Sequence, residues 1–80
     1  MKHYVVVHDW ANEYECGTTI LGVEHSMEKA KKIFNNCLAD EKQYAIENGL
    51  YVYDDYETVF DAGEEGNYIR NHTNLYIQLV

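Results

Sequence analysis

Two stretches near the N-terminus alternate side chains in the way that β-strands do. Residues 2–10 and 17–23 are rich in valine, isoleucine and threonine and are separated by a polar turn at residues 11–16. One side of the first stretch carries His3, Val5 and Val7, and the other carries Tyr4, Val6, His8 and Trp10. Because both sides are partly apolar, we expect the first strand to lie at the centre of a sheet.

The period then changes to three and four residues, which predicts one amphipathic helix over residues 26–48. Its apolar stripe consists of Ala30, Ile33, Phe34, Cys37, Leu38, Tyr44 and Ala45. Ser26 can cap the N-terminal end, and Gly49 tolerates the left-handed conformation that often ends a helix. Glu41 interrupts the stripe, so we expect the helix to fray, bend or meet a partner there.

The remaining chain predicts two more strands. Residues 50–60 form the third, with a bulge or bend at Asp54-Asp55; residues 61–67 form a turn, and residues 68–79 form the fourth. The fold class is α+β, in the order ββαββ, with one long helix packed on a four-stranded, mainly antiparallel sheet in a single domain over residues 1–80. The expected strand order is second, first, fourth, third. The expected core joins Ile33, Phe34 and Leu38 of the helix to Val5, Val7, Ile20, Leu75 and Ile77 of the strands.

The net charge of −8 is unevenly distributed along the chain. Residues 26–48 hold four acidic side chains and four lysines, so their charges cancel. The rest of the chain has ten acidic residues and only two basic ones, Lys2 and Arg70. Six acidic residues fall between positions 54 and 65 with no basic residue among them: Asp54, Asp55, Glu57, Asp61, Glu64 and Glu65. Because nucleic-acid affinity comes largely from Lys and Arg contacts to phosphates, direct nucleic-acid binding is not expected.

The N-terminal segment is too short and too polar for the core of a signal peptide, and no apolar run approaches the roughly 18–20 residues that span a bilayer. We therefore expect a cytoplasmic protein without membrane contact. In such a compartment Cys16 and Cys37 remain free thiols.

The sequence favours no catalytic chemistry. The four histidines have no metal-ligand spacing, the acidic run lacks the order of a calcium loop, and Ser26, the only serine, is explained as a cap. Cys37 lies on the apolar stripe, where a thiol is unreactive. We expect no enzyme, no metal site and no cofactor.

Tyrosines accompany the acidic run, and tyrosine is common at protein interfaces because it offers a large area and a polar tip. The predicted partner-binding surface therefore consists of Tyr53, Tyr56, Asp54, Asp55, Glu57, Asp61, Glu64 and Glu65. Simpler interpretations are also open: the charge keeps the protein in solution, and the tyrosines stabilise the sheet by cross-strand pairing.

These features favour a non-enzymatic protein-binding module whose partner has a basic surface. The stretch from Phe60 to Val80 resembles short proteins of bacteria and their phages. As a class, small acidic chains without catalytic motifs are similar to inhibitors, encoded by phages or mobile elements, that imitate nucleic acid and block host-defence proteins that handle it. The alternative is a small-ligand-binding homo-oligomer with sites between subunits. A homodimer is expected in either case, because an 80-residue core is marginal and sheet edges invite pairing.

Overall fold

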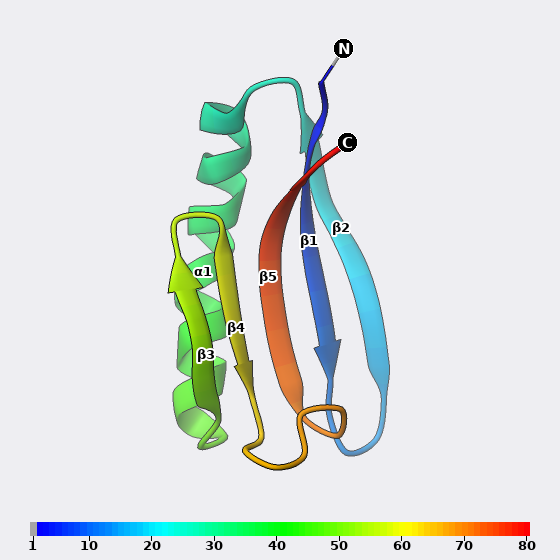
Figure 1. Ribbon diagram of the computed structural model, residues 1–80, viewed down its shortest axis with the longest axis vertical. Helices are drawn as coiled ribbons and strands as arrows, with labels where there is room; N and C mark the ends of the chain where they lie inside the picture. Colours follow the sequence, from blue (N-terminus) through cyan, green and yellow to red (C-terminus); the bar gives the residue numbers. More distant parts are fainter. Residues whose placement is uncertain (1) are drawn as a thin grey trace.

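The computed structural model describes residues 2–80, which form one helix packed on a five-stranded antiparallel sheet (Figure 1). The elements in chain order are β1 (Tyr4–Ala11), β2 (Cys16–Glu24), α1 (Met27–Glu47), β3 (Tyr51–Tyr56), β4 (Val59–Gly63) and β5 (His72–Leu79). The order across the sheet is β2-β1-β5-β4-β3. Helix α1 lies against one face, and no second helix covers the other face within residues 2–80. We call that other face the open face.

The α+β class is confirmed, but the number of strands was wrong. The single strand expected over residues 50–60 is a hairpin, because the chain reverses at Glu57 and Thr58 between β3 and β4. Neither residue is a glycine, asparagine or aspartate, the usual signals of a tight hairpin turn. The last strand begins at His72 rather than at residue 68, so residues 64–71 form a loop. This last strand, β5, pairs with β1, as the expected strand order requires.

Local signals place the helix correctly. The Ser26 side chain accepts a hydrogen bond from the backbone N–H of Lys29, and the helix runs from Met27 to Glu47. At its C-terminal end, the Gly49 N–H donates to the carbonyl of Ile46 and the Leu50 N–H to that of Ala45, with Gly49 at a φ of 63°. This pair of bonds is a Schellman motif, which satisfies carbonyls that would otherwise lack a partner.

The core lies between α1 and the middle strands. Its side chains with no more than 1 % exposure include Phe34 of α1, Val6 of β1, Phe60 of β4 and Leu75 of β5. The expected core residues Ile33, Leu38 and Ile77 pack against this cluster and are partly buried. These contacts fix which face of each strand meets the helix.

For β1 and β2 the expected core residues were wrong. Val6 enters the core against α1, whereas Val7 is buried at 3 % exposure but lies outside that cluster. Val5 is not among the buried residues, and Ile20 is 56 % exposed. Both sides of β1 carry valines, so the alternation could not decide between them. A bulge on β2 adds a second complication, since Val6 pairs with Gly22 while Val7 pairs with Ile20.

Truncating Phe34 should test the core directly. We expect Phe34→Ala to lower the free energy of unfolding by about 3–5 kcal/mol, because it removes a fully buried ring and leaves a cavity. Ile46→Ala, on the same helix at a side chain that is 73 % exposed, should change it by less than about 0.5 kcal/mol. Urea denaturation followed by circular dichroism measures both variants. Equal, small effects would contradict this placement of the core.

Candidate functional site

A row of polar side chains crosses the open face from one edge of the sheet to the other. In this row each residue pairs directly with the next one on the neighbouring strand. From β3 to β2 the residues are Asp54, Asp61, Asn74, Asp9 and Thr18. We call these five residues the polar row. Residues that pair across antiparallel strands share a face, so the row is a continuous band. Its residues come from distant parts of the chain.

The rows on either side have a different character. Toward the β3–β4 turn lies an apolar row, made of Tyr56, Val59, Tyr76, Val7 and Ile20. On the other side the register places Tyr51, Gly63, His72, Ala11 and Cys16. The carboxylates of the polar row therefore lie between the apolar row and this third row, which aromatic rings border.

A bulge in β3 gathers the aromatic rings. The register shifts between Val52 and Asp54, so Tyr53 is the extra residue and joins Tyr51 on the open face. The ring centroids of Tyr51 and Tyr53 are 4.9 Å apart, and those of Tyr53 and Tyr68 are 5.9 Å apart. Tyr68 in turn stacks on His72 at 4.4 Å. These four rings form a connected aromatic strip along one border of the polar row.

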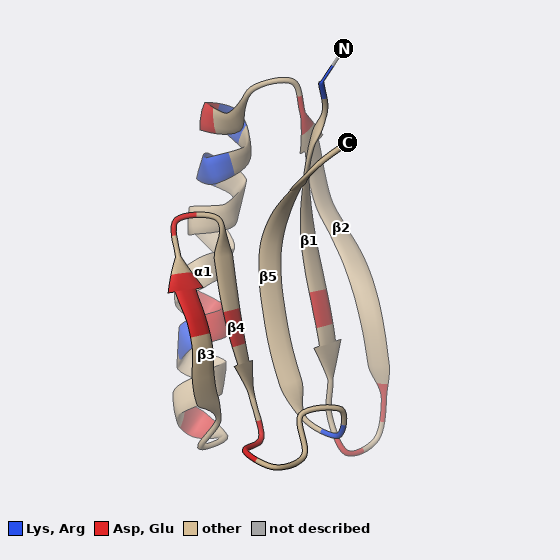
Figure 2. Ribbon diagram, viewed as in Figure 1, with Lys and Arg blue, Asp and Glu red and all other residues tan. Residues whose placement is uncertain are grey.

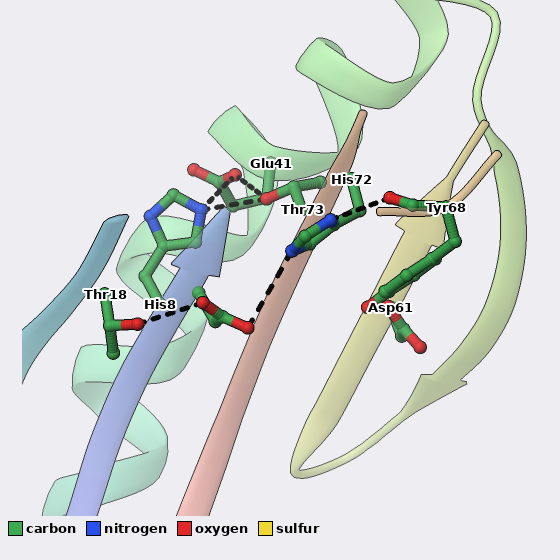
Figure 3. Close-up of polar contacts among 8 residues, drawn as sticks. His8, Thr18, Glu41, Asp61, Tyr68, His72 and Thr73 are labelled. Atoms are coloured by element: carbon green, nitrogen blue, oxygen red, sulfur yellow. Dashed lines mark hydrogen bonds and ion pairs between the residues drawn. The ribbon is translucent and has the colours of Figure 1, made fainter. Parts of the chain in front are cut away.

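Tyr68 reaches this position from the loop between β4 and β5. Its ring lies over Gly63, where an added Cβ would come within 2.3 Å of the ring, so a larger residue does not fit beneath it. The Tyr68 hydroxyl donates a 2.6 Å hydrogen bond to Asp61 (Figure 3). Burial, together with this bond and the charge of Asp61, raises the pKa of Tyr68 far above its usual value. The phenol therefore stays a donor and holds the Asp61 carboxylate in place.

Asp9 accepts a hydrogen bond from Thr18 and lies near His72. The Thr18 hydroxyl donates to it at 2.9 Å, and Nε2 of His72 lies 3.7 Å from its other oxygen. The His72 Nδ1 atom donates to the backbone carbonyl of Tyr68 at 2.8 Å, which fixes the ring and leaves Nε2 turned toward Asp9. Between the two aspartates, the Asn74 side-chain oxygen is buried and has no hydrogen-bond partner among the described residues. The row thus carries an excess of acceptors over donors.

The structure divides the predicted partner-binding residues between two sides of the molecule. Asp54, Asp61, Tyr53 and Tyr56 lie on the open face, whereas Glu64 and Glu65 follow β4 in the loop. Asp55 and Glu57 instead pair with lysines of α1, Asp55 with Lys42 at 3.5 Å and Glu57 with Lys31 at 3.1 Å. Figure 2 shows both colours meeting where β3 passes α1. The six acidic residues therefore do not form one surface.

Sequence reasoning missed three of the five residues of the polar row. Asp9, Thr18 and Asn74 belong to the polar row, and Tyr68 and His72 border it. None of them belongs to the acidic run between residues 54 and 65 from which the site was predicted. Only the pairing of β1 with β5, more than sixty positions apart, brings Asp9 beside Asn74. One signal in the sequence could have indicated them. Asp9 and Asn74 occupy strand positions at which the alternation of side chains would also allow an apolar residue.

A second polar cluster lies on the helix side and explains Glu41. Its carboxylate accepts from the Thr73 hydroxyl at 2.5 Å and lies 2.9 Å from Nε2 of His8 (Figure 3). Because the Thr73 hydrogen goes to Glu41, its oxygen accepts from the same His8 nitrogen, at 2.8 Å. Burial would raise the pKa of Glu41, but the bonds from His8 and Thr73 and the charge of His8 outweigh it and lower that pKa. Glu41 is therefore ionised.

The surroundings of Cys37 oppose ionisation of its thiol. Burial, followed by the charges of Glu41 and Asp40, raises the pKa of the Cys37 thiol, which lowers its reactivity. Within residues 2–80 no three His, Cys, Asp or Glu side chains are grouped so that they could hold a metal ion. In the same range, no helix combines the length and the apolar character needed to cross a membrane.

Comparison with protein-family models, with curated proteins and with solved structures finds no match to this chain.

The Glu41 cluster predicts a pH-dependent contribution to stability. Since the pKa of Glu41 in the folded protein lies below its ordinary value of 4.5, its ionised form stabilises the fold above that pH, and the contribution is lost as the pH falls through the folded pKa. Glu41→Gln should therefore lower the free energy of unfolding by roughly 1–3 kcal/mol at neutral pH, and by less in acid. Glu47→Gln, at an exposed carboxylate of the same helix, should show no such pH-dependent difference. Urea titrations from neutral pH into acid measure the free energy of unfolding of the wild type and of both variants.

Proposed function

We propose that this chain is a non-enzymatic protein-binding module that uses the open face to bind a partner with a basic surface. The observation that carries the proposal is the polar row, in which three carboxylates lie across one uncovered sheet face. These groups are acceptors, so they complement the donors of lysine and arginine side chains.

Electrostatics within the row supports the same conclusion. Asp54 and Asp61 lie directly opposite one another, and like charges in that position destabilise a sheet. Among the described residues, His72 is the one group near the row that can become positive, and it lies beside Asp9 rather than beside this pair. A cation supplied by a partner would relieve the repulsion. Such a contact also speeds association, since opposite charges steer the encounter.

Aromatic side chains on both sides of the row supply contact area. Tyr51, Tyr53 and Tyr56 are 52 %, 46 % and 68 % exposed, although each is large and largely apolar. Exposed tyrosines around a polar centre are typical of interfaces, and their rings can also stack on guanidinium groups. The partner class that best fits is a protein that handles nucleic acid, because such proteins present arginines and lysines to phosphates. An inhibitor that imitates nucleic acid would use a face of this kind.

The experiment compares two variants that lose the same charge from opposite sides of the sheet. Asp9→Asn with Asp61→Asn removes two carboxylates from the polar row; Asp55→Asn with Glu57→Gln removes two that pair with α1. Binding to a panel of purified basic DNA- and RNA-binding proteins is measured by biolayer interferometry at two salt concentrations. We expect salt-sensitive binding to at least one of them, weakened about tenfold or more by the first variant and little by the second.

Two results would contradict the proposal. If both variants weaken binding equally, total charge rather than the row determines binding. If wild-type protein binds no member of the panel, a basic nucleic-acid-handling partner is wrong. Amide shifts in two-dimensional NMR spectra of the bound protein give an independent check, because they should cluster on Asp9, Asp61 and Asn74 rather than on α1.

Self-association is a second proposal, which rests on the edge strand β2. Its residues from Cys16 to Val23 carry no charge, and Ile20 and Val23 are 56 % and 53 % exposed. An uncharged edge with free backbone groups can pair with a second copy of itself in antiparallel fashion, which is a closed two-fold arrangement.

Light scattering at high micromolar concentration should therefore give twice the 9.4 kDa mass of one chain. Thr19→Lys, which places a charge on this edge, should return the protein to a monomer without unfolding it. Asn36→Lys adds the same charge at an exposed position of α1 and should leave the dimer intact. A 9.4 kDa species for the wild type would overturn this second proposal.

A further inference from the structure

A pocket opens between the C-terminal half of α1 and the helix side of β1 and β5. Its volume is about 260 Å³, a little below the roughly 300–1,000 Å³ of pockets for drug-sized ligands. The lining side chains are His8, Trp10, Asn12, Asp40, Glu41, Tyr44 and Thr73. The pocket lies on the face of the sheet opposite the polar row, so the proposed partner surface does not include it.

The charge of the pocket selects the sign of a ligand. Two carboxylates, Asp40 and Glu41, line it, and no lysine or arginine does so within the described chain. The His8 Nε2 hydrogen is already directed to Glu41 and Thr73, so it is not free to bind an anion. Even with His8 protonated, the two carboxylates leave the lining negative.

The aromatic walls are fixed before any ligand arrives. The Trp10 indole lies against Gly17 of β2, where an added Cβ would be 3.0 Å from the ring, so glycine allows the indole to lie close to the strand. The Tyr44 hydroxyl donates to the Asn71 side-chain oxygen at 3.1 Å, which holds its ring from the other side. At the rim, the side-chain oxygen of Asn12 accepts from the backbone N–H of Tyr14 and fixes the β1–β2 turn.

From this combination we infer that the pocket binds a small organic cation with an alkylammonium or alkylguanidinium group. The cationic group meets the carboxylates of Glu41 and Asp40, and the alkyl part lies against the rings of Trp10 and Tyr44. Aromatic faces attract such cations when these are partly removed from water. Rigid walls lower the entropy lost on binding, so a small site of this kind can still bind measurably.

Trp10 is the only tryptophan in the chain and so reports on the pocket directly. The experiment titrates the protein with agmatine, which carries both cationic groups on a four-carbon chain, and follows Trp10 fluorescence. Butane-1,4-diol, a neutral molecule of similar length, and succinate, an anion of similar length, are the controls. We expect a saturable change with agmatine alone, and butylammonium and butylguanidinium then show which group is preferred.

Two variants that remove one charge each from α1 separate the pocket from total charge. Asp40→Asn changes an exposed carboxylate at the pocket, whereas Glu28→Gln changes an exposed carboxylate in the first turn, outside the lining. We expect Asp40→Asn to weaken agmatine binding at least fivefold and Glu28→Gln to leave it unchanged. Glu41→Gln, where it stays folded, should abolish binding. NMR shifts of the Trp10 indole N–H provide a second measurement of the same binding.

No saturable response to any cation would overturn the inference, as would equal responses to agmatine and the diol. Equal weakening by Asp40→Asn and Glu28→Gln would also overturn it, because binding would then follow total charge. These results test the pocket separately from the open face. The variant that tests the open face, Asp9→Asn with Asp61→Asn, leaves every lining residue of the pocket in place.

Discussion

The packing of one apolar helix stripe onto one face of the sheet is the constraint on which the rest of this structure depends. Phe34 lies at its centre and contacts a core built from Val6, Phe60 and Leu75. A single helix can cover only one face of five strands, and the chain has no second helix within residues 2–80. The opposite face must therefore meet water or a partner, and its central row is polar for that reason.

Local features of this fold were readable from the sequence, whereas long-range pairing was not. The helix begins after Ser26 and ends before Gly49 because both residues act on the nearest backbone groups, and such signals survive in any fold. The extra hairpin was missed because Glu57 and Thr58 turn the chain without a typical turn residue. The side of β1 that meets the helix was missed because valines occupy both sides, and only α1 decides between them.

The candidate surface shows the same division between local and long-range information. The run from Asp54 to Glu65 looks like one acidic patch when it is read along the chain, but the hairpin turns alternate members to opposite faces. Lysines of α1 then offset Asp55 and Glu57, although exposed ion pairs of this kind add little stability. Of the remaining members of the run, Glu64 and Glu65 lie in the loop after β4, and only Asp54 and Asp61 belong to the polar row. The pairing register assembles that row from all five strands. Clustering in sequence was a poor guide to clustering in space.

The pocket and the polar row lie back to back across a sheet that is one strand thick. On β5, Thr73 faces the pocket while its neighbours His72 and Asn74 face the open side, and on β1 the same alternation separates His8 from Asp9. No layer of side chains lies between the two surfaces to absorb a displacement. A movement of either strand backbone at one surface is therefore a movement of equal size at the other. The two faces of this small sheet therefore share the backbones of the same strands.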